Sequence, residues 1–253
     1  MENPSSLLIT GASSGLGAAL ALEYAASGVT LALGGRDSGR LEEVAAACRT
    51  RGAEATVSVV DVSDATAMRA WIHAADAKRP LDLVIANAGI SGGTGGGCEP
   101  DDQARRIVAV NVDGVLNTVL PAIPLLRGRR RGQIAIMSSL AGFRGIPGAP
   151  AYCASKAAVR TWGEGLRGWL APDGVEVSVL CPGYVRTPMT AVNRFPMPFL
   201  MPVEKAVAII RRGLRRNRGR IAFPGPMAAA VWLLAALPIA LTDRLVQLLP
   251  AKR

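Results

Sequence analysis

Histidine and paired cysteines are scarce in this chain of 253 residues. Its only histidine is His73, and no two of its four cysteines form a C-x-x-C pair. Zinc sites combine several such ligands at short spacings, so we expect no metal site. Scattered cysteines are typical of a reducing, intracellular setting rather than of a disulfide-bonded secreted fold. The four are Cys48, Cys98, Cys153 and Cys181.

Aromatic residues make up only 4% of the chain, and long unbroken apolar runs are missing. The net charge of +10 favours acidic partners, but no aromatic residues interleave with the arginine cluster of the C-terminal third, so no nucleic-acid partner is expected. Prolines divide the apolar segment that follows this cluster, and its longest proline-free run is 227–237. At 1.5 Å per residue this run spans about 16 Å, which is too short for a transmembrane helix.

The first residues lack the pattern of a secretory signal. Met1-Glu2-Asn3-Pro4 carries no basic region and leads directly into a short apolar strand. We therefore expect a cytoplasmic protein. Half of the residues are apolar, which is enough for one large α/β domain over residues 1–253 with a sizeable core.

A glycine-rich segment, Thr10-Gly-Ala-Ser-Ser-Gly-Leu-Gly17, lies between the first expected strand and a helix. This context is typical of a phosphate-binding loop, although an ordinary strand-to-helix turn is the alternative. Gly11 permits a tight turn, Gly15 a close approach to a pyrophosphate, and Gly17 close packing of the helix on the strand. The helix N-terminus would supply free amides and a positive dipole. The expected cofactor contacts are Gly11, Ser13, Ser14, Gly15, Leu16 and Gly17.

The end of the second expected strand, 29–33, bears on which cofactor binds. In this architecture an acid at the strand tip bonds the ribose of NAD, whereas an arginine accommodates the 2′-phosphate of NADP. Gly35 stands where the acid is expected, and Arg36 follows it. The sequence therefore favours NADP. NAD is the alternative, because a shift of one residue would bring Asp37 into the ribose position.

Each later strand is followed by small or polar residues at its carboxyl end. A carboxylate after the third strand could bond adenine, and small residues after the fourth would let a flat cofactor lie against the sheet. Open parallel sheets bind ligands at this edge, so a doubly wound parallel sheet with helices on both faces is expected. The residues concerned are Asp61, Val62, Asn87, Ala88, Gly89, Pro182, Gly183, Val185 and Thr187.

A breaker-rich loop precedes Tyr152-Cys-Ala-Ser-Lys156, and a helix is expected to begin at about Ala151. Tyr152 and Lys156 would then lie one turn apart on one face. An ammonium close to a phenol lowers the phenol's pKa from about 10, which would let Tyr152 exchange a proton with a carbonyl or alcohol. Taken alone, this spacing also occurs by chance on many helices.

Together, these segments resemble the short-chain dehydrogenase/reductase (SDR) family over residues 7–187. The resemblance implies a single-domain Rossmann fold of the α/β class, with a doubly wound seven-stranded parallel sheet. One departure is Ala86, where an asparagine often precedes Asn-Ala-Gly. The matching motifs are Thr10–Gly17, Asp61-Val62, Asn87-Ala-Gly89, Asn111, Ser139, Tyr152-x-x-x-Lys156 and Pro182-Gly-x-Val-x-Thr187.

The resemblance also implies a catalytic tetrad of Asn111, Ser139, Tyr152 and Lys156. Ser139 and Tyr152 would donate to the substrate oxygen, and Asn111 would position Lys156 through a water. Tyr152 and Lys156 would in addition contact the cofactor, with Lys156 holding the nicotinamide ribose. Val185 and Thr187 would fix the carboxamide.

The function implied is an NADP-dependent oxidoreductase that interconverts a carbonyl and an alcohol on an apolar small molecule. The alternatives are an NAD-dependent alcohol dehydrogenase of the same family and, from another class, a cofactor-binding regulatory protein. A homodimer or homotetramer is expected.

The C-terminal segment, 188–253, is expected to form a substrate lid followed by an apolar tail. Met189–Pro202 is rich in methionine, phenylalanine and proline, which suits a lid. Arginines then gather over 211–220, and 221–242 carries no charge. An apolar tail beside an arginine cluster could bind peripherally to the anionic surface at the inner face of a membrane. Alternatively, the tail completes the pocket or a subunit interface.

Overall fold

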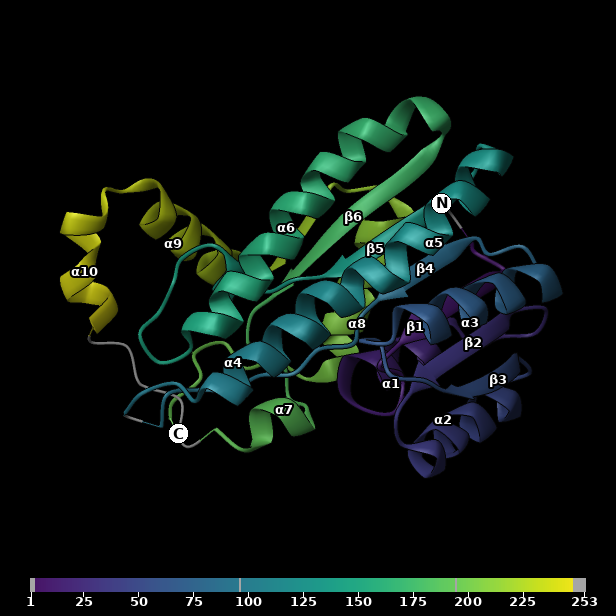
Figure 1. The fold of residues 1–253 in the computed structure, drawn as a ribbon, viewed down its shortest axis with the longest axis horizontal. Helices are drawn as coiled ribbons and strands as arrows, with labels where there is room; N and C mark the ends of the chain where they lie inside the picture. The colour runs from purple at the N-terminus through teal and green to yellow at the C-terminus, as the bar shows by residue number, and fades with distance from the viewer. Residues whose placement is uncertain (1–2, 96, 194, 248–253) are drawn as a thin grey trace.

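Short runs of valine, isoleucine, leucine and alanine form seven strands of one parallel sheet (Figure 1). The structure is a computed structural model and describes residues 3–95, 97–193 and 195–247. The strand order is β3-β2-β1-β4-β5-β6-β7. The strands are β1 (Ser6–Thr10), β2 (Thr30–Gly35), β3 (Glu54–Val59), β4 (Leu83–Ala86), β5 (Gly132–Met137), β6 (Val175–Pro182) and β7 (Arg220–Phe223).

Helices cover both faces of the sheet because the strands are apolar on both sides. Aspartates begin two of them: Asp37 and Asp64 accept hydrogen bonds from the first-turn amides of α2 and α3. One face carries α1 (Gly15–Tyr24), α2 (Ser38–Thr50) and α8 (Val203–Arg215). The other carries α3 (Ala65–Lys78), α4 (Asp101–Val108), α5 (Gly114–Arg129) and α6 (Pro150–Leu170).

The sheet is doubly wound, as the sequence predicted. Strand β1 pairs with β2 on one side and with β4 on the other, so the strand order reverses beside β1. A crevice forms at such a reversal, outside the carboxyl ends of the strands. The shorter elements are η1 (Ala109–Asp113), η2 (Leu140–Gly142), η3 (Ala171–Asp173), α7 (Pro188–Ala191), α9 (Gly225–Ala236) and α10 (Ile239–Gln247).

Within the described residues, one helical stretch, 101–129, is long and apolar enough to cross a membrane by length and composition. Half of its most apolar window, 50%, is buried inside the fold, where α5 packs on α3, β4 and β5. Its composition therefore reflects packing in the core. Helix α9 is apolar but spans only 12 residues.

The arginine cluster and the apolar tail, which the sequence analysis joined as one surface, lie apart. Helix α8 runs back toward the amino edge of the sheet, where Arg211 pairs with Glu23 in the last turn of α1 at 2.9 Å. Helix α9 begins after the carboxyl end of β7, and α9 and α10 lie at one end of the molecule (Figure 1). Segments adjacent in the sequence thus come to opposite edges, because α8 is antiparallel to the strand that follows it.

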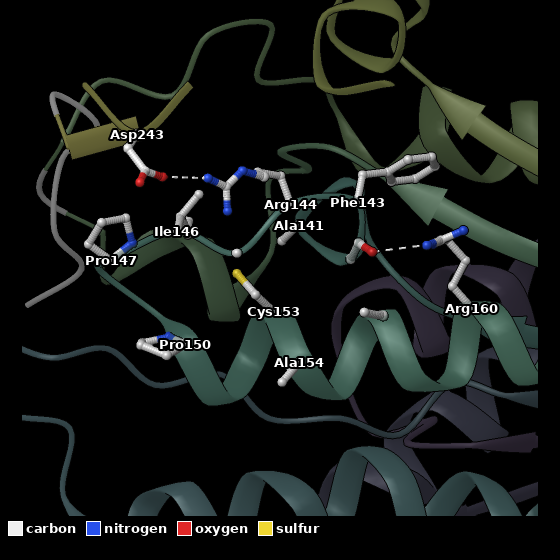
Figure 2. A pocket seen from close by; sticks show the side chains of 13 residues that line it. Ala141, Phe143, Arg144, Ile146, Pro147, Pro150, Cys153, Ala154, Arg160 and Asp243 are labelled. Carbon is white, nitrogen blue, oxygen red and sulfur yellow. Dashed lines mark hydrogen bonds and ion pairs between the residues drawn. The ribbon is translucent and has the colours of Figure 1, made fainter. Parts of the chain in front are cut away.

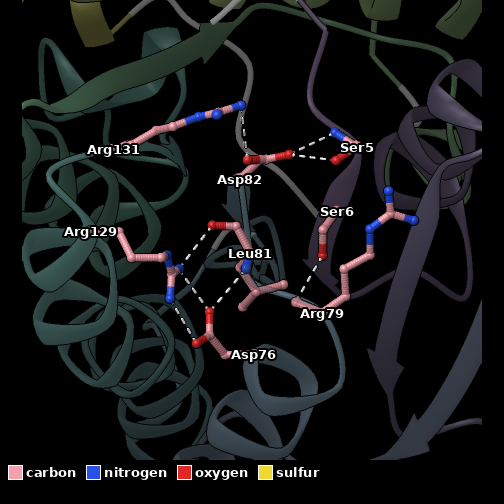
Figure 3. Close-up of polar contacts among 8 residues, drawn as sticks. All are labelled: Ser5, Ser6, Asp76, Arg79, Leu81, Asp82, Arg129 and Arg131. Carbon is pink, nitrogen blue, oxygen red and sulfur yellow. Dashed lines mark hydrogen bonds and ion pairs between the residues drawn. The ribbon is translucent and has the colours of Figure 1, made fainter.

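A polar clamp ties the amino edge of the sheet together (Figure 3). Asp82 accepts hydrogen bonds from the amide and hydroxyl of Ser5 at 2.8 and 2.9 Å. Asp76 accepts two from Arg129, both at 2.8 Å, and one from the Leu81 amide at 2.9 Å. These bonds fix the entry of β4 against β1, α3 and α5.

Replacing Asp76 with alanine should lower the free energy of unfolding by about 2 kcal/mol, the usual scale for hydrogen bonds to a charged group. The Asp76 side chain is only 12% exposed, so water cannot fully replace its three donors. Asp101→Ala is the control, because the Asp101–Arg105 pair is 79% and 78% exposed and should contribute under about 0.5 kcal/mol. Urea denaturation measures both, and equal losses would contradict the clamp.

Candidate active site at the carboxyl edge

One cavity of about 710 Å³ runs along the carboxyl edge of the sheet. It extends from the glycine-rich turn before α1, past the β4 and β5 ends, to the lid and α9. Nearly all residues that the sequence nominated line it; Gly17 and Asn111 lie beneath its wall. Those lining it are Gly11, Ser13, Ser14, Gly15, Leu16, Arg36, Asp61, Val62, Asn87, Ala88, Gly89, Ser139, Tyr152, Lys156, Pro182, Gly183, Val185 and Thr187.

The glycine-rich turn is shaped as a nucleotide-binding loop requires. Gly11 and Gly15 have φ of 65° and 55°, in the left-handed region that favours glycine. A side chain at Gly17 would collide with the carbonyl oxygen of Gly11 and lie 2.6 Å from Nδ2 of Asn87. The side chain of the N-cap residue Ser14 makes no hydrogen bond to the first turn of α1. The backbone amides of that turn can therefore donate to a phosphate. A dinucleotide fits these residues.

Asn87 fastens this turn to β4. Its backbone amide and that of Ala88 donate to the Thr10 hydroxyl at 3.0 and 3.1 Å. Its side-chain Nδ2 donates to the carbonyl oxygens of Thr10 and Gly11 at 2.9 and 3.2 Å. The asparagine that the sequence placed at the cofactor therefore also holds the two strand ends in register.

Two arginines line the cavity at the tip of β2. Arg36 was expected there; Arg40 was not. Asp37 is engaged elsewhere, since it caps α2 through the Arg40 amide and pairs with the Arg40 side chain at 3.2 Å. Hydrogen bonds from the amide and hydroxyl of Ser63, with a smaller contribution from Arg36, hold the pKa of Asp61 below its ordinary value.

Ser139, Tyr152 and Lys156 meet beside the carboxyl ends of β5 and β6. The Ser139 hydroxyl donates a hydrogen bond to the Pro182 carbonyl at 3.4 Å and lies close enough to Tyr152 to favour its phenolate. Ser139 is also fixed by the Ala141 amide, which donates to its hydroxyl at 3.1 Å. Lys156 Nζ lies 5.8 Å from the centroid of the Tyr152 ring and donates to the Met137 carbonyl at 2.9 Å. Helix α6 begins at Pro150, one residue before the expected start.

The pKa of Tyr152 is shifted in the direction opposite to the expected one. Burial raises it to about 12, and the nearby Ser139 hydroxyl acts against that rise. Burial also lowers the pKa of Lys156 to about 8. The ammonium lies over the ring rather than at the hydroxyl, so the loss of hydration outweighs its attraction for a phenolate. Tyr152 is thus held in its protonated form at neutral pH.

Asn111 lies in η1, a π-helical turn between α4 and α5. Such turns are frequent at functional sites. Its side chain is fully buried, accepts from the Ile90 amide at 2.8 Å, and donates to the Ile90 carbonyl at 2.9 Å and the Ser155 hydroxyl at 3.0 Å. A methyl group at Gly89 would lie 3.2 Å from Oδ1 of Asn111 and 3.3 Å from Nζ of Lys156. Glycine at position 89 therefore leaves room for both groups.

The far end of the cavity is apolar, with Arg144 in its wall. The lid contributes Phe195 and Pro198, and α9 contributes Met227, Val231 and Leu234, so the tail completes the pocket. Arg144 also lines a second cavity of about 570 Å³ beside the first (Figure 2). Its guanidinium pairs with Asp243 of α10 at 2.8 Å, which joins α10 to the loop after η2.

Comparison with known proteins decides the family. The sequence profile described as short chain dehydrogenase matches residues 5–196. The chain belongs to the short-chain dehydrogenase family. An "Uncharacterized oxidoreductase" of Myxococcus xanthus (strain DK1622) is 40% identical over 237 residues, which cover 93% of this chain and 94% of the relative. The prediction of an oxidoreductase of this family is confirmed.

Solved structures of this family share the fold. A short-chain dehydrogenase from Sphingobium yanoikuyae in complex with NADPH has a TM-score of 0.79 and 26% identity, with 98% of both chains covered. One from Mycobacterium paratuberculosis bound to NAD has a TM-score of 0.74 and 24% identity, covering 83% of this chain and 90% of that one. The fold thus occurs with either cofactor bound.

Sequence reasoning missed three residues of this site. Ser155, the partner of Asn111, lies inside the Tyr152–Lys156 segment and could have been suspected from that position. Arg40 lies four residues after Arg36, but only the cap at Asp37 shows that it turns toward the cavity. Arg144 had no signal in the sequence, because its place depends on α10 packing beside it.

Substituting Lys156 by methionine should change how stability depends on pH. The pKa of Lys156 is about 8 in the fold and 10.5 as the ordinary value, so between these the unfolded chain binds more protons and stability rises with pH. The variant lacks this rise. The wild-type-minus-variant difference in unfolding free energy should therefore grow by about 3 kcal/mol from pH about 8 to about 10.5.

Denaturant titrations of both proteins across that pH range measure the difference. Groups that titrate there away from Lys156, such as Tyr24 and Cys48, contribute equally to both proteins and cancel. If the wild-type-minus-variant difference in unfolding free energy does not change with pH over this range, Lys156 keeps its ordinary pKa.

Proposed function

We propose that this protein is an NADP-dependent oxidoreductase that interconverts a carbonyl and an alcohol on an apolar small molecule. The observation that supports it best is the meeting of Ser139, Tyr152 and Lys156 at the junction of the two ends of one cavity. The glycine-rich turn and two arginines line one end. Apolar side chains of the lid and α9 line the other.

A nicotinamide held at the β4 and β5 ends would supply or accept the hydride, and the residues of the protein hold and move the proton. Ser139 and Tyr152 donate hydrogen bonds to the substrate oxygen and stabilise the negative charge that develops there. Tyr152 then gives its proton to that oxygen, since an alkoxide is a stronger base than a phenolate with a pKa near 12. The protonated phenol is the form that carbonyl reduction needs.

Lys156 and Asn111 act as positioning residues. Lys156, bonded to the Met137 carbonyl, holds positive charge over the ring of Tyr152 and would stabilise the phenolate left after proton transfer. Asn111 joins Ile90 to Ser155 and so holds the segment after β4 against α6. With both amide ends bonded to protein groups, Asn111 can support Lys156 through packing at Gly89.

The preference for NADP rests on Arg36 and Arg40. Two guanidinium groups near the ribose end of the cavity suit a 2′-phosphate, which accepts charge-assisted hydrogen bonds. The acid that NAD would require is occupied, because Asp37 caps α2 and pairs with Arg40. A homodimer or homotetramer and a cytoplasmic location remain predictions.

Tyr152→Phe should lower kcat for ketone reduction by about a hundred- to ten-thousandfold, the range for loss of a general acid. The ring and its packing remain, so the dissociation constant for NADPH, measured by fluorescence titration, should stay within about threefold. Tyr24→Phe is the control, a buried tyrosine outside the cavity. Residual activity of Tyr152→Phe within about tenfold of the parent would remove Tyr152 from the proton-transfer role.

NADPH should be preferred to NADH, and Arg36→Ala should narrow that preference by about ten- to a hundredfold through weaker NADPH binding. Arg40→Ala should act in the same direction. Arg69→Ala, an exposed arginine on α3 outside the cavity, is the matched control. Comparing kcat/KM for the two cofactors tests this, and a parent enzyme that prefers NADH would refute the assignment.

A further inference from the structure

Large apolar side chains exposed to solvent gather in two segments that also line the substrate end of the main cavity. Among the described residues twelve are exposed, and eight of them lie in two segments, 188–199 and 225–241. We call these eight the cavity rim. They are Met189, Val192, Phe199, Trp232, Leu233, Leu237, Ile239 and Leu241.

The two rim segments also form the walls of the substrate end. Helix α9 faces two ways: Met227, Val231 and Leu234 line the cavity, whereas Trp232 and Leu233 are 59% and 55% exposed on the outside. No residue of α9 is fully buried. Figure 1 shows α9 and α10 at one end of the molecule, away from the helical layers that cover the sheet. The apolar lining of the cavity therefore continues onto an apolar outer surface.

The charged residues of the two stretches of sequence that contain the rim have one sign. Residues 183–203 include two arginines and no acidic residue, and 221–242 include no charged residue. The first acid after the rim, Asp243, is paired with Arg144. An apolar surface with neighbouring positive charge is complementary to an anionic lipid surface, where apolar side chains enter the acyl boundary and arginines meet headgroups.

We propose that the cavity rim docks on an anionic lipid surface, with the outer face of α9 and the lid segment in contact with lipid. The cavity mouth then opens toward the acyl region. A carbonyl substrate with a long apolar chain passes from the lipid to Tyr152 without crossing water. The docking itself is independent of the proposed function. The route of the substrate from lipid to Tyr152 rests on the proposed function.

A lipid surface fits the rim better than a second copy of the chain. The rim belongs to the same two segments that line the substrate end of the cavity, so a second subunit seated there would restrict the entry of an apolar substrate. Trp232 suits a lipid interface, because its ring is apolar and its N–H can remain in the wet headgroup layer. The arginines of α8 take no part, because this helix runs back to the amino edge of the sheet, and Arg220 is engaged by Glu164.

Co-sedimentation with vesicles tests the docking, using phosphatidylcholine alone and an equimolar mixture of phosphatidylcholine and phosphatidylglycerol. The full chain should pellet with the mixed vesicles, and Trp232→Ser/Leu233→Ser should reduce the pelleted fraction by about tenfold. Both positions are more than half exposed, so the fold should persist. Trp169→Ser is the matched control, since Trp169 is 55% exposed on α6.

A second variant separates the rim from the arginine cluster. Arg212→Gln/Arg215→Gln/Arg216→Gln should pellet like the parent, because these residues face away from the rim edge.

Turnover of a short water-soluble ketone should be unchanged in Trp232→Ser/Leu233→Ser, whereas turnover of a long-chain ketone in vesicles should fall. Absence of any ketone turnover would refute the proposed function and leave the pelleting result to stand alone.

Three outcomes would overturn the docking. The parent fails to pellet with anionic vesicles; the Trp232/Leu233 variant pellets as well as the parent; or only the arginine variant loses binding. A fourth outcome that would overturn the docking can be measured by light scattering after size-exclusion chromatography. If Trp232→Ser/Leu233→Ser lowers the molecular mass of the particle, the rim is an interface between copies of this chain.

Discussion

The hydrogen bonds of Asn87 hold together the two strand ends on which the rest of the site depends. They connect the end of β4 with Thr10 and Gly11 at the end of β1, where the order of the sheet reverses. Because all strands are parallel, their carboxyl ends meet along this edge, and the glycine-rich turn and the Ser139–Tyr152 pair open onto one cavity. Moving either strand end would separate the cofactor end from the reacting group.

Burial, more than any single charge, sets the chemistry of the polar groups in this cavity. It raises the pKa of Tyr152 and lowers that of Lys156, because burial penalises the charged form of each group. Hydrogen bonds offset part of this cost: Lys156 donates to the Met137 carbonyl, and Asn111 accepts from the Ile90 amide. A protonated phenol, fixed beside a second hydroxyl in an apolar surrounding, is suited to delivering one proton to a strong base.

The C-terminal segments shape the substrate end of the cavity and the outer surface beside it. The lid and α9 close the substrate end with apolar side chains, and the Arg144–Asp243 pair joins α10 to the loop that carries the second cavity. The same segments leave an apolar outer surface around the mouth. One stretch of chain therefore shapes both what can enter the cavity and what the molecule can touch.

The sequence by itself determined the strand ends and the motifs, because their spacing is local: a strand, a glycine turn and a helix identify Gly11–Gly17, and one helical turn joins Tyr152 to Lys156. It could not give the direction of the Tyr152 pKa shift, which depends on surrounding burial rather than on that spacing. Nor could it find Arg144, or show that the 211–220 arginines and the apolar tail lie apart. Those features arise from contacts distant along the chain and from the reversal of direction between α8 and β7, which only the tertiary structure decides.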